Sequence, residues 1–164
     1  MKKLKIAIFA FIIGLTINSM SFCQTIYNFK DGLIQAKAQN KKVLINIYDE
    51  KNTWSNKMES VYANENIKRL VSGNFIYVKL NSQGANKYPY NGKDITEIEL
   101  AKLFGATGYP SHVFLNADGS IIKIKYNGEA ISSFPGFCEA PDFEKLLNFI
   151  ISGQYNNNDL SKIL

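Results

Sequence analysis

Hydrophobic and polar residues alternate along the chain in two patterns, one typical of strands and one typical of helices. Residues 42–48 and 75–80 are nearly continuous apolar runs of strand length, the pattern of strands that are covered on both faces. Between them, residues 54–72 place apolar side chains at helical spacing, with a break expected near Asn64. A strand, a helix and a strand in this order predict parallel strands joined by a right-handed crossover.

Capping residues and turns mark the other elements. Thr96 and Glu99 form a capping box, in which each side chain accepts a backbone amide of the other residue. In the strand predicted at residues 120–126, lysines alternate with isoleucines. One face is therefore expected to be exposed to solvent, which suits a strand at the edge of a sheet. The remaining elements predicted are a helix at 28–40, a loop at 81–93, a helix at 96–104, strands at 112–115 and 120–126, and a helix at 141–151.

The first residues have the pattern of a secretory signal peptide. A basic start with three lysines precedes a charge-free apolar run at residues 6–17, which is too short to span a bilayer stably. Small side chains favour cleavage between Cys23 and Gln24, so residues 1–23 are predicted to be removed. Lipidation of Cys23 is the alternative, but it requires a small residue where Phe22 stands. We therefore expect a periplasmic or secreted protein that meets the membrane only during export.

The composition, 46% hydrophobic and 20% charged, is that of a globular protein. The net charge of +5 alone would suggest a nucleic-acid or membrane partner, but three of the 19 basic side chains lie in the predicted signal, leaving 16 against 14 acidic ones. We therefore expect no nucleic-acid partner. The mature chain suffices for one domain, predicted at 24–153, with a polar tail at 154–164. Cys138 is its only cysteine, so it has no internal disulfide to form.

The order of these elements, with Gly108, Tyr109 and Pro110 just before the third strand, resembles the thioredoxin fold. In that family a cis-proline begins this strand. The resemblance implies an α/β fold, a three-layer α/β/α sandwich around a mixed four-stranded sheet. More narrowly, residues 92–101 and 135–147 resemble the periplasmic thioredoxin-like proteins of the SoxW type.

The same resemblance places the family's Cys-x-x-Cys motif on Asn52, Thr53, Trp54 and Ser55. In the family, the dipole and free amides of the helix that starts here stabilise a thiolate. An amide at one end and a hydroxyl at the other cannot exchange disulfides, so dithiol chemistry is excluded at this site. Asn46 is a second departure, because many relatives place a buried carboxylate there, and we expect it to be a hydrogen-bonded amide within the sheet.

The resemblance also implies a surface that binds polypeptide. In thioredoxin-like proteins an extended client pairs with the backbone of the residue before the cis-proline, here Tyr109. The alternative is that the aromatic residues around it only pack the core. The expected client-binding residues are Trp54, Tyr109, Pro110 and Phe137, with the loop residues Tyr88 and Tyr90 nearby.

Cys138 is expected to lie close to that surface, where it could act as a single reactive thiol. Against this, free cysteines are often small core hydrophobes, no basic residue adjoins it, and Glu139 would raise its pKa. A nucleophilic pair of Ser55 and His112 lacks an orienting acid. One histidine and one cysteine cannot supply a metal site, so we expect no metal and no cofactor.

Three hypotheses for the function follow. The first is an exported thioredoxin-like protein without a redox dithiol that binds polypeptide clients or partner proteins, as a chaperone-like or adaptor module. The second is a monothiol oxidoreductase that uses Cys138. The third is a protein that reduces disulfides only together with a partner that supplies the missing cysteines. Whether the protein is an enzyme is left open, with the first hypothesis favoured.

Overall fold

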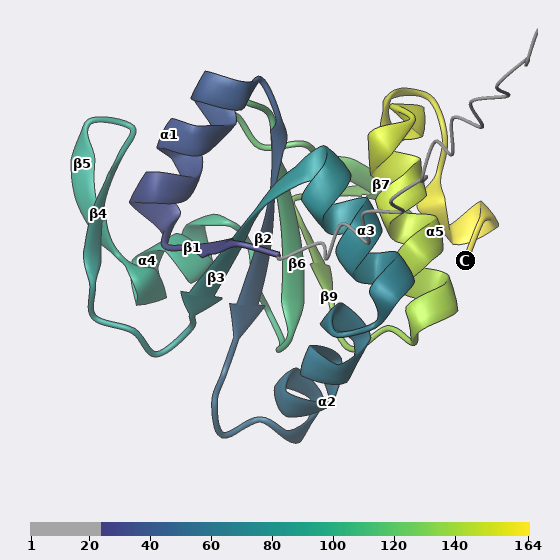
Figure 1. The fold of residues 1–164 in the computed structure, drawn as a ribbon, viewed down its shortest axis with the longest axis horizontal. Coiled ribbons are helices and arrows are strands. Elements are labelled where there is room, and N and C mark those ends of the chain that lie inside the picture. Colours follow the sequence, from purple (N-terminus) through teal and green to yellow (C-terminus); the bar gives the residue numbers. More distant parts are fainter. Residues whose placement is uncertain (1–23) are drawn as a thin grey trace, which may run out of the picture.

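The computed structural model describes residues 24–164 (Figure 1). The predicted signal peptide at residues 1–23 lies outside the described residues. Within the described part, every helix is too short or too polar to cross a membrane.

A mixed sheet of five strands forms the centre of the molecule, in the order β1-β3-β2-β6-β9. The strands β1 (Ile26–Tyr27), β3 (Phe75–Asn81) and β2 (Lys42–Tyr48) are parallel, and β6 (Ser111–Leu115) and β9 (Ser133–Pro135) are antiparallel to their neighbours. The two apolar runs are therefore central strands, as predicted. The expectation of four strands is wrong because β1 pairs with β3 over two residues only, which is too short to give a hydrophobic pattern.

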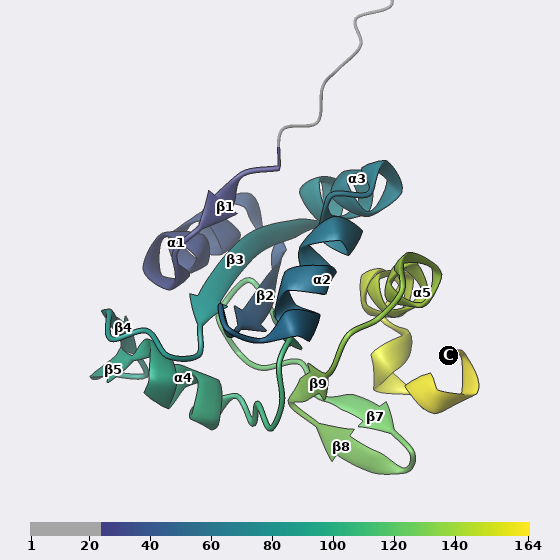
Figure 2. The same cartoon turned by 90° about the horizontal axis from the view of Figure 1, so that it is seen from below.

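Helices cover both faces of the sheet, which gives the expected three layers (Figures 1 and 2). One face carries α1 (Phe29–Gln39) and α4 (Glu97–Leu103), and the other carries α2 (Thr53–Tyr62), α3 (Glu65–Asn74) and α5 (Ala140–Ile151). Asn64 separates α2 from α3 as predicted, because its side chain accepts the amides of Asn66 and Ile67 and so begins a new helix. The capping box of Thr96 and Glu99 is also confirmed.

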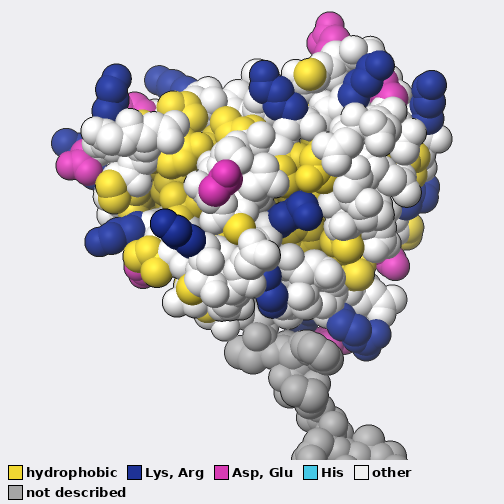
Figure 3. Space-filling view, turned by 90° about the horizontal axis from the view of Figure 1, so that it is seen from above, with side chains coloured by type: hydrophobic (Ala, Val, Ile, Leu, Met, Phe, Trp, Pro, Cys, Tyr) yellow, Lys and Arg dark blue, Asp and Glu magenta, His cyan; other side chains and the backbone are white. Residues whose placement is uncertain are grey.

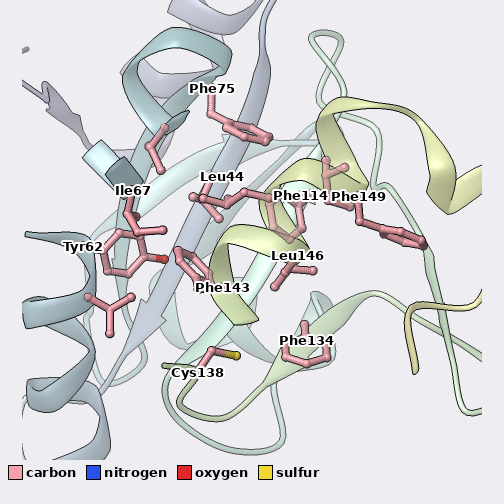
Figure 4. Close-up of a cluster of buried hydrophobic side chains, with 14 of the residues drawn as sticks. Leu44, Tyr62, Ile67, Phe75, Phe114, Phe134, Cys138, Phe143, Leu146 and Phe149 are labelled. Atoms are coloured by element: carbon pink, nitrogen blue, oxygen red, sulfur yellow. The ribbon is translucent and has the colours of Figure 1, made fainter. Parts of the chain in front are cut away.

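Each face of the sheet has its own hydrophobic core. The core under α2, α3 and α5 includes Tyr62, Phe114 and Phe143, and Figure 4 shows its side chains interleaved between the sheet and the helices. The core under α1 and α4 includes Phe29 and Phe104. Burial on both faces explains why β2 and β3 are largely apolar.

The structure corrects the prediction of one continuous strand at residues 120–126. Its end forms β7 (Ile124–Tyr126), which pairs with β8 (Glu129–Ile131) in a separate hairpin, and β9 takes the edge position in the main sheet. Ile122 and Ile124 are buried in the core under α5. The start of the segment does pair with β6 as predicted, through a bridge between Leu115 and Ile121, but the chain leaves the main sheet before β7 begins.

The structure also corrects the prediction of a loop at residues 81–93. It contains β4 (Lys87–Tyr90), which pairs with β5 (Lys93–Thr96) in a hairpin against α1. The Tyr90 ring is buried and lies 5.4 Å from that of Phe29 and 5.7 Å from that of Phe104. Tyr88 packs against the same core. These two tyrosines therefore belong to the core. The expectation that they lie near Trp54 is wrong.

The C-terminal tail packs against the domain. It forms two short 3-10 helices, η1 (Gln154–Asn156) and η2 (Leu160–Lys162), and Leu160 is fully buried in the core under α5. The Asp159 carboxylate accepts the backbone amides of Asn127 and Gly128 at the tip of the β7–β8 hairpin, at 3.1 and 2.7 Å. The tail thus joins the hairpin to the final helix.

Candidate functional site

The start of α2 is held by its own side chains. Asn52 is the N-cap residue, and its Oδ1 accepts the amides of Trp54 and Ser55 at 2.9 and 3.1 Å. The Ser55 hydroxyl is buried and accepts the Asp49 amide at 3.2 Å. Two of the amides that could stabilise an anion at this helix end are therefore satisfied by Asn52. Within residues 24–164, Cys138 is the only thiol.

An apolar cavity of about 310 Å³ opens beside this helix start, and it is lined by Trp54, Tyr109, Gly136 and Phe137. We call this cavity the groove. The Trp54 ring lies 5.5 Å from that of Phe137, and 54% of Trp54 is exposed. The structure thus brings together three of the four residues expected to bind a client. The fourth, Pro110, is buried behind them, and Gly136 was missed because a residue without a side chain gives no pattern.

The backbone along the groove is partly free. The Tyr109–Pro110 peptide bond is cis, and the Pro110 carbonyl accepts the Gly136 amide at 2.8 Å, which joins the two sides of the groove. Neither the amide nor the carbonyl of Tyr109 makes a hydrogen bond to another described residue. Unpaired backbone groups at an accessible edge are the groups that an extended peptide uses in strand addition.

Lys57 adds a charge to the groove that the sequence did not reveal. Its Nζ lies 4.5 Å from the centre of the Phe137 ring and 5.3 Å from that of Trp54, a cation–π arrangement with both rings. The same ammonium lies 3.6 Å from the Glu139 carboxylate. Lys57 is one helical turn after Trp54, and this spacing is the signal that could have identified it.

Cys138 points into the core rather than into the groove, and Figure 4 shows it in the cluster beneath α5. Burial raises the pKa of its thiol to about 11, and the negative charge of the nearby Asp142 raises it further. The acidic residue that raises this pKa is thus Asp142, whereas Glu139 had been expected. With a pKa of about 11, only about one thiol in ten thousand is ionised at neutral pH. This placement makes Cys138 a weak nucleophile.

His112 is fully buried and belongs to a polar group within the core. Its Nδ1 lies 3.0 Å from the Tyr62 hydroxyl, and burial lowers its pKa to about 4, against the opposing effect of the Gly136 backbone. Ser55 binds Asp49 instead, so the imagined pair of Ser55 and His112 does not form. Opposite His112 across β2 and β6, Asn46 donates to the Tyr77 hydroxyl at 3.4 Å.

The prediction for Asn46 is only half right. Its amide nitrogen has a partner, but its Oδ1 has none among residues 24–164. Burial also raises the pKa values of Tyr62 and Tyr77. All four side chains are therefore neutral at neutral pH, and the lowered pKa of His112 makes its imidazole a weak base.

Other surfaces of the described chain offer less. Residues 24–164 contain no group of three His, Cys, Asp or Glu side chains placed to hold a metal ion. The face seen from above in Figure 3 carries lysine and arginine side chains scattered over its middle and its rim, with apolar patches between them. The groove differs from these surfaces in that it combines exposed aromatic rings with free backbone groups.

Comparison with known proteins places this arrangement in a family. A model of the thioredoxin-like domain matches residues 29–151. A thioredoxin-fold protein from Helicobacter pylori is similar in structure, with 19% identity over 76% of this chain and 80% of that chain and a TM-score of 0.62. A thioredoxin from Thermus thermophilus gives 20% identity over 76% and 85% of the two chains and a TM-score of 0.55.

A third similar structure is that of DsbH oxidoreductase, with 19% identity over 76% of this chain and 82% of that chain and a TM-score of 0.53. A search of curated proteins gives no match. At these identities the similar structures support the fold alone. The family match, which covers most of the chain, together with the cis-proline step and the order of strands, shows that this chain belongs to the thioredoxin-like domain family.

Proposed function

We propose that this protein binds extended polypeptide segments in the groove, as a chaperone-like or adaptor module, and that it does not exchange disulfides there. The observation that carries the proposal is the free backbone of Tyr109 beside an apolar cavity. A segment that pairs with Tyr109 would lay its side chains against Trp54 and Phe137. Half-exposed aromatic side chains with polar tips are typical of recognition surfaces.

The chemistry at the start of α2 supports binding without disulfide exchange. Disulfide exchange needs a thiolate, and the positions that the family resemblance assigns to cysteines hold Asn52 and Ser55. Asn52 instead occupies the helix amides that would stabilise such a thiolate. We further propose that the protein is exported and related to the SoxW-type group, on the basis of its signal-like N-terminus and the motifs described above.

A second candidate function is thiol chemistry at Cys138. It is favoured by one observation, that Cys138 directly follows the groove residue Phe137 in the chain. Burial and the raised pKa of the thiol oppose it. A Cys138→Ser variant that loses mixed-disulfide adducts formed by the wild type would support this candidate, and unchanged adducts would count against it.

The fluorescence of Trp54 provides the test of peptide binding, because it is the only tryptophan in the chain and it lies in the groove. The protein is titrated with a reduced and alkylated, permanently unfolded protein that lacks tryptophan. We expect a saturable shift in the Trp54 emission. Tyr109→Asp, which places a charge in the groove, is expected to weaken this binding strongly.

Ile34→Asp is the matched control, because Ile34 on α1 is 54% exposed, as Trp54 is, but lies outside the groove. This variant is expected to bind like the wild type. The proposal fails if unfolded protein does not change the emission at any concentration, or if both variants bind as tightly as the wild type. Equal loss in both variants would also contradict it, because the effect would then be nonspecific.

A further inference from the structure

The same tripeptide, Tyr-Asn-Gly, forms the tips of two hairpins. Tyr90 pairs with Lys93 across the β4–β5 turn, and Tyr126 pairs with Glu129 across the β7–β8 turn, so each turn consists of two residues. Asn91 and Gly92 have φ values of 50° and 76°, and Asn127 and Gly128 have values of 52° and 85°. Positive φ at both positions is typical of the type I′ turn, for which Asn-Gly is the preferred sequence. All four turn residues are exposed.

Asn-Gly sequences have a characteristic reactivity. Because glycine has no side chain, its backbone nitrogen can approach the side-chain carbonyl carbon of the preceding asparagine. When that nitrogen loses its proton and attacks, a new C–N bond closes a succinimide ring and the asparagine amide leaves as ammonia. Water then opens the ring to aspartate or isoaspartate. The net reaction consumes one water, releases one ammonia and adds one negative charge.

The two turns differ in what holds their backbone. The Gly128 amide, the nitrogen that would attack, donates to Asp159 Oδ2 at 2.7 Å, and the Asn127 amide donates to Oδ1 at 3.1 Å. The Ser161 hydroxyl and these amides lower the pKa of Asp159 to about 2, so it is ionised at neutral pH. A carboxylate at this distance opposes loss of the amide proton, because the resulting anion would face a negative charge.

In the β4–β5 turn the Asn91 side chain faces the Tyr90 hydroxyl, but no carboxylate within residues 24–164 accepts the backbone amides. Neither the Asn91 amide nor the Gly92 amide donates to another described residue. The two strands pair only with each other, so opening of this turn breaks no bond to the main sheet. The β7–β8 turn, in contrast, is tied to the tail, which buried Leu160 anchors in the core.

We infer that Asn91 is a site of spontaneous deamidation in the folded protein, whereas Asn127 is protected by Asp159. An isoaspartate at position 91 adds a methylene to the backbone of a two-residue turn and so disturbs the pairing of Tyr90. The Tyr90 hydroxyl donates to the Gly119 carbonyl at 3.1 Å, which makes this contact the first that such a product would strain.

The test compares the two sites within one molecule. The purified protein is incubated at mildly alkaline pH, and peptides that contain each site are followed by mass spectrometry, with isoaspartate separated by chromatography. Loss of one hydrogen bond to a charged group corresponds to roughly a tenfold change in an equilibrium. We therefore expect Asn91 to convert roughly tenfold faster than Asn127, or more. In the denatured protein, the two sites share the same local tripeptide and are expected to convert at similar rates.

The Asp159→Asn variant is expected to speed conversion at Asn127 without changing the rate at Asn91. Equal rates at the two sites in the native protein, or faster conversion at Asn127, would overturn the inference. A folded Asp159→Asn protein in which Asn127 stays unmodified would overturn the protective role of Asp159. If that variant does not fold, the wild type is used, and the rate in the native protein is divided by the rate in denaturant at each site. A smaller ratio at Asn127 than at Asn91 supports the inference, and equal ratios overturn it.

Discussion

Replacement of Asn52 by alanine removes the cap of α2 and tests whether the helix start is held as described. The Asn52 side chain accepts two backbone amides, and alanine leaves both without an intrahelical partner. Substitutions of this kind cost about 1 kcal/mol of stability, and up to about 2 kcal/mol where no water replaces the acceptor. In a domain of this size, we expect the thermal midpoint to fall by roughly 4 °C for each kcal/mol.

The assay combines thermal unfolding with Trp54 emission. Because Trp54 lies in the first turn of α2, fraying of that turn is expected to change its emission already in the folded protein. Asn64→Ala is the matched control, since Asn64 caps α3 through the same two kinds of bond, at 3.0 and 3.4 Å. It is expected to lower the midpoint similarly but to leave the emission of the folded protein unchanged.

Asn52→Asp is the conservative variant, because a carboxylate keeps the acceptor and suits the positive end of the helix dipole. It is expected to be as stable as the wild type or more so. An Asn52→Ala protein that unfolds at the wild-type temperature with wild-type emission would refute the view that this residue serves as a cap. So would an Asn52→Asp protein that is as unstable as the alanine variant.

Three further predictions concern ionisable groups. The pKa of His112 is about 4, below its ordinary 6.5, so folding favours the neutral ring. The wild type should therefore lose roughly 3 kcal/mol of stability between neutral pH and pH 4, seen as a falling urea midpoint, and His112→Leu should show a flatter profile. Asp159 has a lowered pKa of about 2, so Asp159→Asn should lower the thermal midpoint at neutral pH, with the difference disappearing as the pH falls through about 2. Cys138, with its raised pKa of about 11, should react with a thiol reagent far more slowly in the native protein than in denaturant, and equal rates would place it at the surface.

The elements that local chemistry determines could be predicted from the sequence. Asn64 ended one helix and began the next because its side chain competes for backbone amides, and this signal needs no distant partner. The central strands were predicted in a similar way, from continuous apolar runs, whereas the cis peptide bond before Pro110 was expected from the resemblance to the thioredoxin fold. Where one contiguous segment contains all the information, sequence reasoning succeeded.

Pairing between distant segments could not be predicted. The alternation at residues 120–126 marks a segment with one buried face, but it does not reveal that only the start of the segment pairs with β6 and that its end pairs with β8. Tyr88 and Tyr90 suit a surface as well as a core, and only their packing against Phe29 decides between the two. In the groove, the contact of Lys57 with Phe137 joins distant parts of the chain, so its spacing from Trp54 was the only local signal. Gly136 has no side chain to give a pattern, and its partner Pro110 lies far along the chain.

The docked tail changes where the folding unit ends. The family match stops at residue 151, yet Leu160 fills a place in the core beyond it. A protein shortened to the end of α5 would open an apolar hole under that helix and release the β7–β8 hairpin from its tether. Shortened versions of this protein for crystallography or display should therefore keep the chain at least through η2.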